Sequence, residues 1–282
     1  MSVFYTANVC GFQKKMEMAR VQHYRLEGSP SFTSHINKVR KSIVKRILFI
    51  VGLLLAFNAT AANLHIESFS KAKKTLEKNV YFDHRTTLYC GASFDTKKNI
   101  TPPPGFKSDK YVKRSKKVEW EHVVPAENFG RTFIEWRDGD TQCVNNKGKA
   151  YKGRRCANKA SKEYRLMQSD LYNLFPAIGS VNAARSNYNF TMLPAEPADF
   201  GSCQVKIDNR KAEPPIAARG RIARTYLYME QSYSRYRMSK SQRQLMAAWD
   251  KQFPVSAWEC KRAERIEKLQ GNVNNVLKTR CH

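Results

Sequence analysis

Alternation of apolar and polar residues marks one short strand near the middle of the chain. Residues 118–124 alternate at first and then become continuously apolar, and Pro125 closes the run. This pattern predicts a β-strand. Because adjacent residues of a regular strand point to opposite faces, Glu121 and His122 can serve one site only if the strand ends or bends there. We expect a strand-to-loop transition at His122.

Apolar residues at three- and four-residue steps predict helices over much of the remaining chain. The expected helices cover residues 69–80, 166–174, 181–185, 216–233, 241–253 and 257–269. Ser180 is the expected N-cap of the third, because serine accepts from the free N–H groups of a helix start. With 41% hydrophobic residues in 282, the chain can bury a core in one or two domains.

Residues 40–61 have the layout of a secretory signal peptide. Basic residues at 40–46 precede an apolar segment at 47–57 and a small-residue cleavage box at 59–61. This apolar segment is much shorter than the roughly 20 residues that span a bilayer, so removal is expected rather than anchoring. Because a signal peptide normally begins near the chain start, we expect initiation near Val39 and interpret residues 1–39 as an extension from a mis-assigned start. A genuine extension or an uncleaved anchor is the alternative, and residues 62–282 are expected to form a single domain.

The formal charge of +26 is the strongest compositional signal. Without residues 1–61 the chain keeps 41 basic and 22 acidic residues, so the signal peptide does not cause the basicity. Such self-repulsion favours a polyanionic partner, with nucleic acid as the first candidate. Anionic lipid, polysaccharide and acidic proteins are the alternatives.

Six cysteines remain after residue 61, an even number that agrees with export. They are Cys90, Cys143, Cys156, Cys203, Cys260 and Cys281. Six cysteines can form three disulfides in fifteen ways, and the sequence does not choose among them. No two are separated by the two to four residues of a zinc knuckle, so disulfides are favoured over metal.

Three side chains could combine into a site that hydrolyses phosphodiesters. A neutral imidazole at His122 can take a proton from water, and Glu121 offers a hard oxygen to Mg²⁺. Asn182, in the first turn of its predicted helix, offers a second, uncharged oxygen. An arginine at 154, 155 or 185 could hold the phosphate. Taken singly, each of these residues has a simpler explanation as strand-end surface, helix cap or solvated face.

Several spaced motifs in one order resemble the bacterial endonuclease I family of secreted, sequence-tolerant nucleases. They are Trp120-Glu121-His122-Val123-Val124-Pro125-Ala126, then Ser169-Asp170-Leu171-Tyr172-Asn173-Leu174, Pro176-Ala177-Ile178-Gly179, Val181-Asn182, Arg185-Ser186-Asn187-Tyr188, Glu213-Pro214-Pro215, Arg219-Gly220, Ile222-Ala223-Arg224 and Tyr228-Met229. The resemblance covers most of residues 88–253. It implies an α+β, mostly helical single domain around a ββα-metal (His-Me finger) core.

The resemblance also assigns roles by position. It implies one Mg²⁺ per active site, held by Glu121 and Asn182, with His122 as the base. The family's phosphate-stabilising arginine precedes a cysteine, which favours Arg154 and leaves Arg155 open. Further nucleic-acid contacts are expected from Arg155, Arg185, Arg219 and Arg224. The resemblance implies an enzyme that leaves 5′-phosphate ends on DNA and RNA, and we expect it to be monomeric and periplasmic or secreted.

Two non-enzymatic alternatives fit the same charge. In an exported nucleic-acid-binding protein, for example one that serves DNA uptake, His122 would be incidental. A cationic cell-wall or membrane-active protein is disfavoured, because no long amphipathic basic helix dominates the sequence after residue 61.

Overall fold

Two paired strands and a helix form the centre of the structure, a computed structural model that describes residues 62–281. β3 (Val118–His122) and β4 (Leu174–Ile178) are antiparallel, and α8 (Gly179–Arg185) follows β4 directly. This arrangement confirms the predicted α+β fold around a strand–strand–helix core. The expected extension and signal peptide, residues 1–39 and 40–61, lie outside the described residues.

β4 is an element that the sequence pattern did not predict. The helix expected over residues 166–174 ends at Gln168, and a 3₁₀ turn leads into the strand. All five residues of β4 are buried, so the strand shows no alternation. The N–H of Leu88 donates to the carbonyl of Pro176 over 2.8 Å, so the backbone of Pro176 faces away from β3. Its missing N–H therefore costs the β3–β4 ladder no hydrogen bond.

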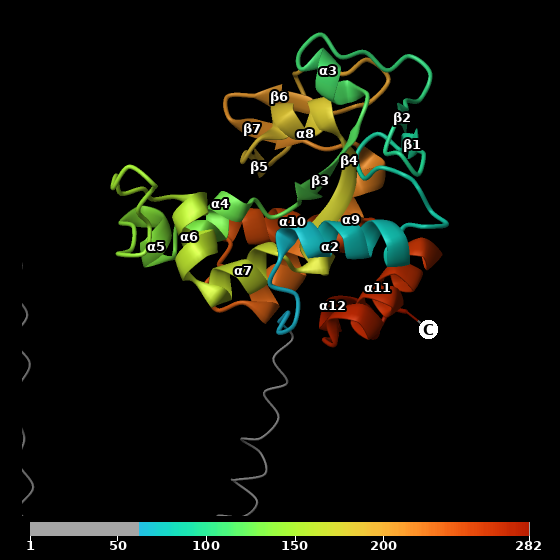
Figure 1. Cartoon of the computed structure of the whole chain (residues 1–282). Helices are drawn as coiled ribbons and strands as arrows, with labels where there is room; N and C mark the ends of the chain where they lie inside the picture. The colour runs from blue at the N-terminus through green and yellow to red at the C-terminus, as the bar shows by residue number, and fades with distance from the viewer. Residues whose placement is uncertain (1–61, 282) are drawn as a thin grey trace, which may run out of the picture. The chain divides into compact units, whose positions relative to one another are not determined.

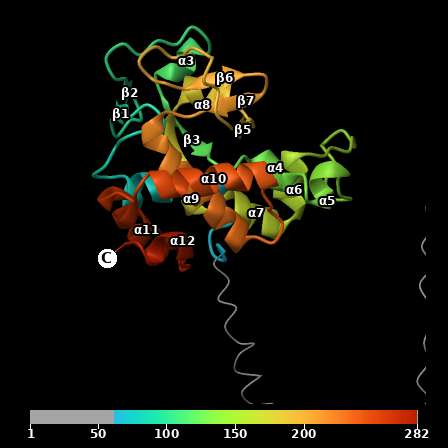
Figure 2. The ribbon, with the colours of Figure 1, turned by 180° about the vertical axis from the view of Figure 1, so that it is seen from behind.

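Helices cover the two strands from both sides (Figures 1 and 2). Figure 1 shows α2 in front of the strands, whereas α9 and α10 lie behind them and come forward in Figure 2. The helices are α2 (Phe69–Thr75) with the π-helix η1 (Leu76–Val80), α4 (Ala126–Gly130), α5 (Ile134–Arg137), α6 (Arg154–Ala160), α7 (Lys162–Gln168) with η2 (Leu171–Asn173), α9 (Ile216–Ser232), α10 (Lys240–Gln252), α11 (Ala257–Gln270) and α12 (Asn275–Lys278).

Four of the predicted helices agree with the structure, and one predicted cap does not. α2 with η1, α9, α10 and α11 match their expected ranges within one residue at each end. Gly271 has φ 79°, the left-handed conformation that ends α11 without steric cost. The predicted cap was wrong, because Ile178 is the N-cap of α8 and the hydroxyl of Ser180 is buried without a partner.

Short strands form the opposite part of the structure, above β3 in Figure 1. They are β1 (Ser93–Phe94), β2 (Ile100–Thr101), β5 (Asn189–Phe190), β6 (Lys206–Asp208) and β7 (Lys211–Glu213), with α3 (Val112–Ser115) beside them. β7 pairs parallel with β5 and antiparallel with β6. No helix among the described residues is long and apolar enough to cross a membrane.

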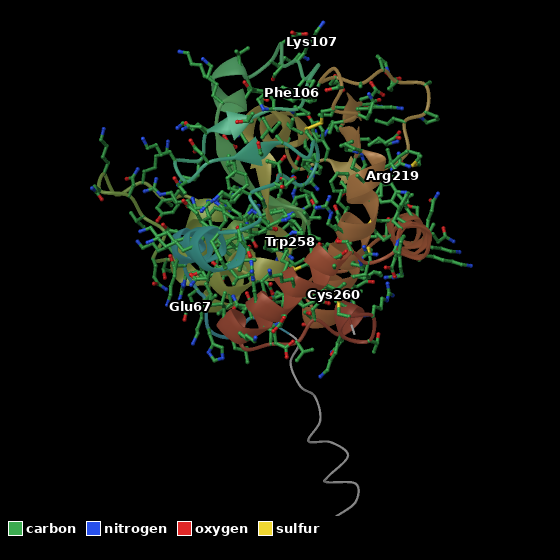
Figure 3. All side chains as sticks on the ribbon, turned by 90° about the vertical axis from the view of Figure 1, so that its right-hand side faces the viewer. Glu67, Phe106, Lys107, Arg219, Trp258 and Cys260 are labelled. Carbon is green, nitrogen blue, oxygen red and sulfur yellow. A yellow bond between two sulfur atoms is a disulfide. The ribbon has the colours of Figure 1, made fainter. Side chains whose placement is uncertain are left out.

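Three disulfides tie loops and helix ends to this framework. They join Cys90 to Cys203, Cys143 to Cys156, and Cys260 to Cys281. The prediction of three disulfides is confirmed, and the structure selects one of the fifteen pairings. Cys260 lies near the end of α11 that carries Trp258 (Figure 3). The Cys143–Cys156 bond closes the long loop between α5 and α6, which fixes the start of α6.

Candidate active site

The ends of β3, α6 and α8 contribute side chains to one pocket of about 370 Å³. Glu121, His122, Arg154 and Asn182 are all among its lining residues. β3 ends at His122, as expected from the geometry of a strand that must place two neighbouring side chains at one site. The structure thus brings together the four residues given catalytic and metal-binding roles in the sequence analysis.

His122 is buried and has one nitrogen already engaged. Its Nε2 lies 2.8 Å from the carbonyl oxygen of Gln168. Because a carbonyl only accepts, Nε2 carries the proton and Nδ1 keeps its lone pair. Burial, followed by the positive charge of Arg154, lowers the pKa of His122 to about 3. The ring is therefore neutral at pH 7, the state that a general base requires.

Two buried side chains hold the backbone that follows His122. Asn173 donates to the carbonyl of Val124 over 3.0 Å, and its own Oδ1 accepts from the N–H of Val124 over 2.8 Å. Arg185 donates to the carbonyls of His122 and Val123 over 2.7 Å and 2.5 Å. These bonds satisfy backbone groups that the end of β3 leaves open and fix the direction of the imidazole.

Glu121 presents one anchored and one open carboxylate oxygen. Its Oε1 accepts from the hydroxyl of Tyr89 and from Nη1 of Arg185, each over 2.5 Å. Within residues 62–281 no group donates to Oε2. Burial raises the pKa of Glu121, but Arg185 and Tyr89 oppose this shift. Although burial alone would lower the pKa of Arg185, the carboxylate raises it, so the two groups form an ion pair at neutral pH.

The amide of Asn182 is oriented by a second acid on β3. Its Nδ2 donates to Oε2 of Glu119 over 2.8 Å, and Arg114 donates to the same carboxylate over 2.7 Å and 2.5 Å. Because a carboxylate only accepts, the amide nitrogen must face Glu119. Oδ1 of Asn182 then has no donor among the described residues, and it remains available for a ligand.

These donors fit a hard divalent cation. Glu121 Oε2 and Asn182 Oδ1 are a carboxylate and an amide oxygen without partners in the described part of the chain, and both side chains line one pocket. Mg²⁺ is often held by one or two carboxylates and keeps several waters. Among residues 62–281, no three His, Cys, Asp or Glu side chains gather as potential metal ligands.

A family model named Endonuclease I matches residues 60–280 of the chain. The chain belongs to the endonuclease I family. An extracellular deoxyribonuclease of Aeromonas hydrophila is 39% identical over 243 residues, covering 84% of this chain and 99% of that protein. A periplasmic deoxyribonuclease of the same species is 37% identical, covering 83% of this chain and 95% of the relative. Endonuclease-1 of Buchnera aphidicola subsp. Acyrthosiphon pisum (strain APS) is also 37% identical, with coverages of 77% and 83%.

In this endonuclease I family member, the two neighbouring arginines of α6 have different surroundings. Gly153, with φ 79°, precedes the helix in a conformation that favours glycine. Arg154 is exposed, lines the pocket of His122, and forms no ion pair with a described carboxylate. Arg155 lines only the adjoining pocket, and its guanidinium carbon lies 4.2 Å from the ring centroid of Tyr151. The placement therefore suits Arg154 better than Arg155 for a phosphate at the site.

Three arginines that were predicted to contact nucleic acid instead form ion pairs within the protein. Arg185, 1% exposed, is paired with Glu121. Arg224, 2% exposed, is paired with Glu259 over 2.6 Å. Arg219, on α9 in Figure 3, is mostly buried and donates to Glu213 over 2.6 Å. Such placement disfavours direct phosphate contact by these three arginines, because a guanidinium engaged by a buried carboxylate has fewer donors left for a phosphate.

Two site residues were missed by sequence reasoning. Phe69 of α2 lines the pocket, with its ring centroid 4.9 Å from that of His122 and 5.4 Å from the guanidinium carbon of Arg154. Only tertiary packing brings this residue to β3. Glu119 was detectable, because residues two apart on a strand share a face and Glu119 stands two before Glu121.

Basic side chains also line the pockets beside the site. One adjoining pocket shares Phe69, Trp120 and Asn182 with the site and adds Lys73, Lys74 and Lys98. Another shares Phe69 and Arg154 and adds Arg155 and Arg165. Basic residues outnumber acidic ones in both linings, which favours the approach of a polyanion to His122.

Proposed function

We propose that this chain is a periplasmic or secreted, Mg²⁺-dependent endonuclease that hydrolyses DNA and RNA with little sequence preference. Membership of the endonuclease I family makes it a nuclease. Relatives that match most of the chain are named extracellular and periplasmic deoxyribonucleases, which supports both the substrate and the location.

One observation carries the mechanism: a neutral imidazole and two free oxygens face the same pocket. The lone pair of His122 Nδ1, Oε2 of Glu121 and Oδ1 of Asn182 have no partner in the described chain, although their residues are otherwise held by hydrogen bonds. None of the three is among the buried unpartnered atoms of the described residues, so each is open to the pocket, where water, a metal ion or a substrate can reach it. This arrangement therefore supports binding and catalysis rather than a purely structural role.

The chain's own residues divide the work of hydrolysis. His122 Nδ1 takes the proton of the attacking water as the new phosphorus–oxygen bond forms. The Nε2–H bond to Gln168 holds the ring in place and strengthens when the ring becomes cationic. Arg154 contacts the non-bridging oxygens and offsets their growing charge. Bound at Glu121 and Asn182, Mg²⁺ would supply positive charge that offsets the charge developing in the reaction. The bond from phosphorus to the 3′ oxygen breaks, the 3′ oxygen takes a proton from solvent water, and the phosphate stays on the 5′ end.

Low sequence preference follows from the groups around the site. The charged side chains of the adjoining pockets are mostly lysines and arginines, which contact phosphates and carry no base-specific information. We therefore expect the enzyme to cleave single- and double-stranded DNA and RNA, with cuts at many different sequences in each. Incubation of a labelled tRNA and of a plasmid with the same protein compares the two substrates.

A plasmid-nicking assay tests the function. Oxidised protein expressed with residues 62–282 is expected to convert supercoiled plasmid to open circles in Mg²⁺ and to stop when EDTA is added. DNA binding without chelator-sensitive cleavage would favour the exported nucleic-acid-binding protein instead. Binding to anionic vesicles but not to DNA would favour the cationic surface protein.

A further inference from the structure

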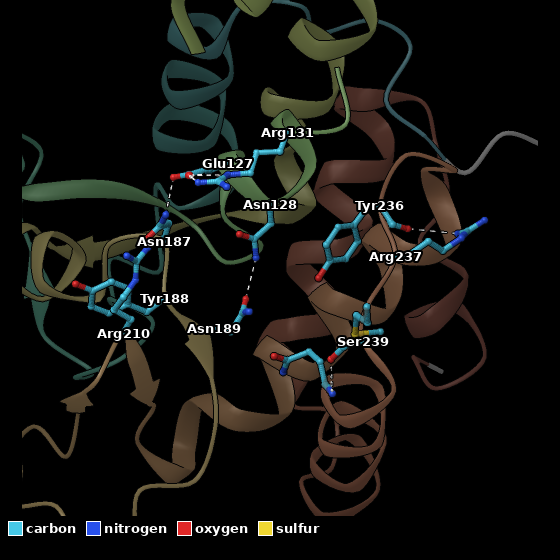
Figure 4. A pocket seen from close by; sticks show the side chains of 12 residues that line it. Glu127, Asn128, Arg131, Asn187, Tyr188, Asn189, Arg210, Tyr236, Arg237 and Ser239 are labelled. Atoms are coloured by element: carbon cyan, nitrogen blue, oxygen red, sulfur yellow. Dashed lines mark hydrogen bonds and ion pairs between the residues drawn. The ribbon is translucent and has the colours of Figure 1, made fainter. Parts of the chain in front are cut away.

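A second pocket of about 450 Å³ adjoins the candidate active site (Figure 4). Glu127 and Asn187 line both pockets, and Nδ2 of Asn187 donates to Oε2 of Glu127 over 2.5 Å. These two side chains stand at the border between the pockets. Arg131 donates to the other oxygen of Glu127 over 2.8 Å, so the negative charge at this border is already paired.

Arg210 brings a further positive charge to the second pocket, close enough to Glu127 to help Arg131 lower the pKa of that carboxyl. It lies at the tip of the β6–β7 hairpin, where Asn209 and Arg210 have φ 39° and 59°, as the two central residues of a tight hairpin turn require. It is exposed and forms no hydrogen bond or ion pair with any residue in 62–281. A guanidinium with all its donors free matches the oxygens of a phosphate.

A buried amide donor in the same pocket also lacks a partner. Nε2 of Gln242, on α10, is buried and finds no acceptor among the described residues. Buried donors without acceptors are rare in folded proteins and unfavourable. Because this nitrogen is shielded from the pocket, the half-buried Gln242 side chain must turn its amide outward to meet an acceptor such as a phosphate oxygen or a base carbonyl.

The remaining lining offers a surface for a base. Tyr188 follows α8, and Figure 4 shows it on the side of the pocket that carries Asn187 and Arg210. Nδ2 of Asn128 donates to Oδ1 of Asn189 over 2.9 Å, which leaves an acceptor on the first amide and a donor on the second. An aromatic ring beside mixed amide edges can stack on a base and bond to its edge.

We propose that the second pocket binds one nucleotide of the strand that the active site cleaves. Its phosphate lies on Arg210, and its base lies against Tyr188. This inference rests on the proposed nuclease function, because the border at Glu127 and Asn187 connects the two pockets. It adds a contact beyond the cleaved bond, so longer strands gain affinity that a single phosphodiester cannot obtain.

A binding comparison tests the phosphate contact. The protein carries His122→Ala, and fluorescence anisotropy measures its affinity for a labelled thymidine 12-mer at several salt concentrations. Adding Arg210→Ala is expected to weaken binding roughly tenfold and to lower the slope of log K against log salt by about 1. The matched control is Lys211→Ala, which removes the same charge from the next residue of the hairpin, outside the pocket lining. Equal effects of the two substitutions would overturn the phosphate contact.

A second comparison tests the base contact. Tyr188→Ala is expected to weaken 12-mer binding by about five- to tenfold, whereas Tyr188→Phe, which keeps the ring, binds as before. On an oligonucleotide of abasic sites the Ala and Phe variants should bind equally. Stacking would be overturned if Tyr188→Phe lost as much affinity for the 12-mer as Tyr188→Ala. It would also be overturned if the two variants still differed in affinity for the abasic strand. Thermal melting identifies any variant that is not folded.

Small-substrate kinetics separate this inference from the proposed function. Arg210→Ala should raise the KM for the 12-mer and leave hydrolysis of bis(p-nitrophenyl) phosphate unchanged, since that ester has only the phosphate that is cleaved and none for Arg210. Equal losses on both substrates would contradict the inference. If the unsubstituted protein hydrolyses neither substrate, the proposed function is overturned. The binding comparisons use the His122→Ala protein, so they would still show whether the second pocket binds a nucleotide.

Discussion

Glu121 and His122 show what a single residue's sequence context can and cannot predict. The requirement that neighbouring side chains meet at one site predicted the end of β3 at His122, and the structure confirms it. Which atom of each residue stays free is set by hydrogen bonds to the other atom, and the partners, such as Tyr89, Gln168 and Arg185, lie far away in sequence. No local pattern contains those partners, so the sequence predicted the residue types of the site but not their bonding.

Replacing His122 by alanine removes the proposed base and leaves the basic surroundings intact. We expect His122→Ala to lower turnover at least about 100-fold, because positioned bases contribute about 10²- to 10⁴-fold, with DNA affinity near normal. Steady-state nicking and anisotropy measure the two quantities. His84→Ala is the control, since His84 stacks on Trp258 with ring centroids 3.9 Å apart and does not line the site pocket. Full activity of the His122 variant would remove the residue from the mechanism.

The burial of His122 predicts an unusual titration. In the unfolded chain the ring gains its proton as the pH falls through about 6.5, whereas in the metal-free folded protein it does so only near 3. Between these values the folded state binds one proton fewer at this residue, so His122 makes folding less favourable as the pH falls. ¹⁵N NMR of labelled histidines should show a neutral, Nε2-protonated ring from pH 7 to pH 4.5. A midpoint near 6 would contradict the buried geometry.

Glu119 should act on the metal through Asn182. In Glu119→Ala the amide loses the carboxylate that orients it, and we expect the Mg²⁺ concentration for half-maximal activity to rise about 10- to 100-fold, with less effect on the rate at saturating metal. The control is Glu163→Ala, an exposed acid of α7 paired with Arg235 over 2.7 Å. An unchanged Mg²⁺ titration would show that the amide is held by other contacts.

Among the elements, the helices were easier to predict than the second strand. The spacing of apolar residues in α9, α10 and α11 is a local pattern, and the structure has helices where it predicts them. β4 has no local signature, because it is buried on every residue and contains Pro176. Its identity comes from pairing with β3, more than fifty residues earlier. Without β4 the sequence pattern could not place α8, and so Asn182, beside His122.

Arg185 joins α8 to the end of β3, so replacing it should lower the free energy of unfolding. Arg185→Met leaves the carboxylate of Glu121 buried without its cation, which typically costs about 3–5 kcal/mol of unfolding free energy. Glu121→Gln in the same protein should recover part of this loss. Arg155→Met, on an exposed position of α6, should change stability by no more than about 0.5 kcal/mol. Urea unfolding compares the variants, and a loss as small as that of Arg155→Met would show that the pair is not a structural tie.

Over the whole molecule, net charge predicted a polyanionic partner but not where that partner binds. Several arginines form ion pairs within the protein, among them Arg185, Arg219 and Arg224. Folding decides which cations remain, because a buried carboxylate selects its partner by proximity in space. The basic residues that line the pockets around His122, such as Lys73 and Arg155, come from α2 and α6, which no pattern connects.

Salt dependence separates the cations that bind nucleic acid from those that only add charge. Each phosphate contact releases counterions, so log K for DNA should fall linearly with log salt. We expect Lys73→Ala and Arg155→Ala, measured by anisotropy in the His122→Ala protein, each to lower the slope by about 1. Lys261→Ala removes the same charge from α11, where Lys261 lies 3.3 Å from Asp83 and lines a pocket that shares no residue with the site. The slope for Lys261→Ala should stay unchanged, because a charge that is distant from the strand releases no counterions. Equal slopes for all three variants would mean that total charge, rather than the pockets around the site, sets the affinity.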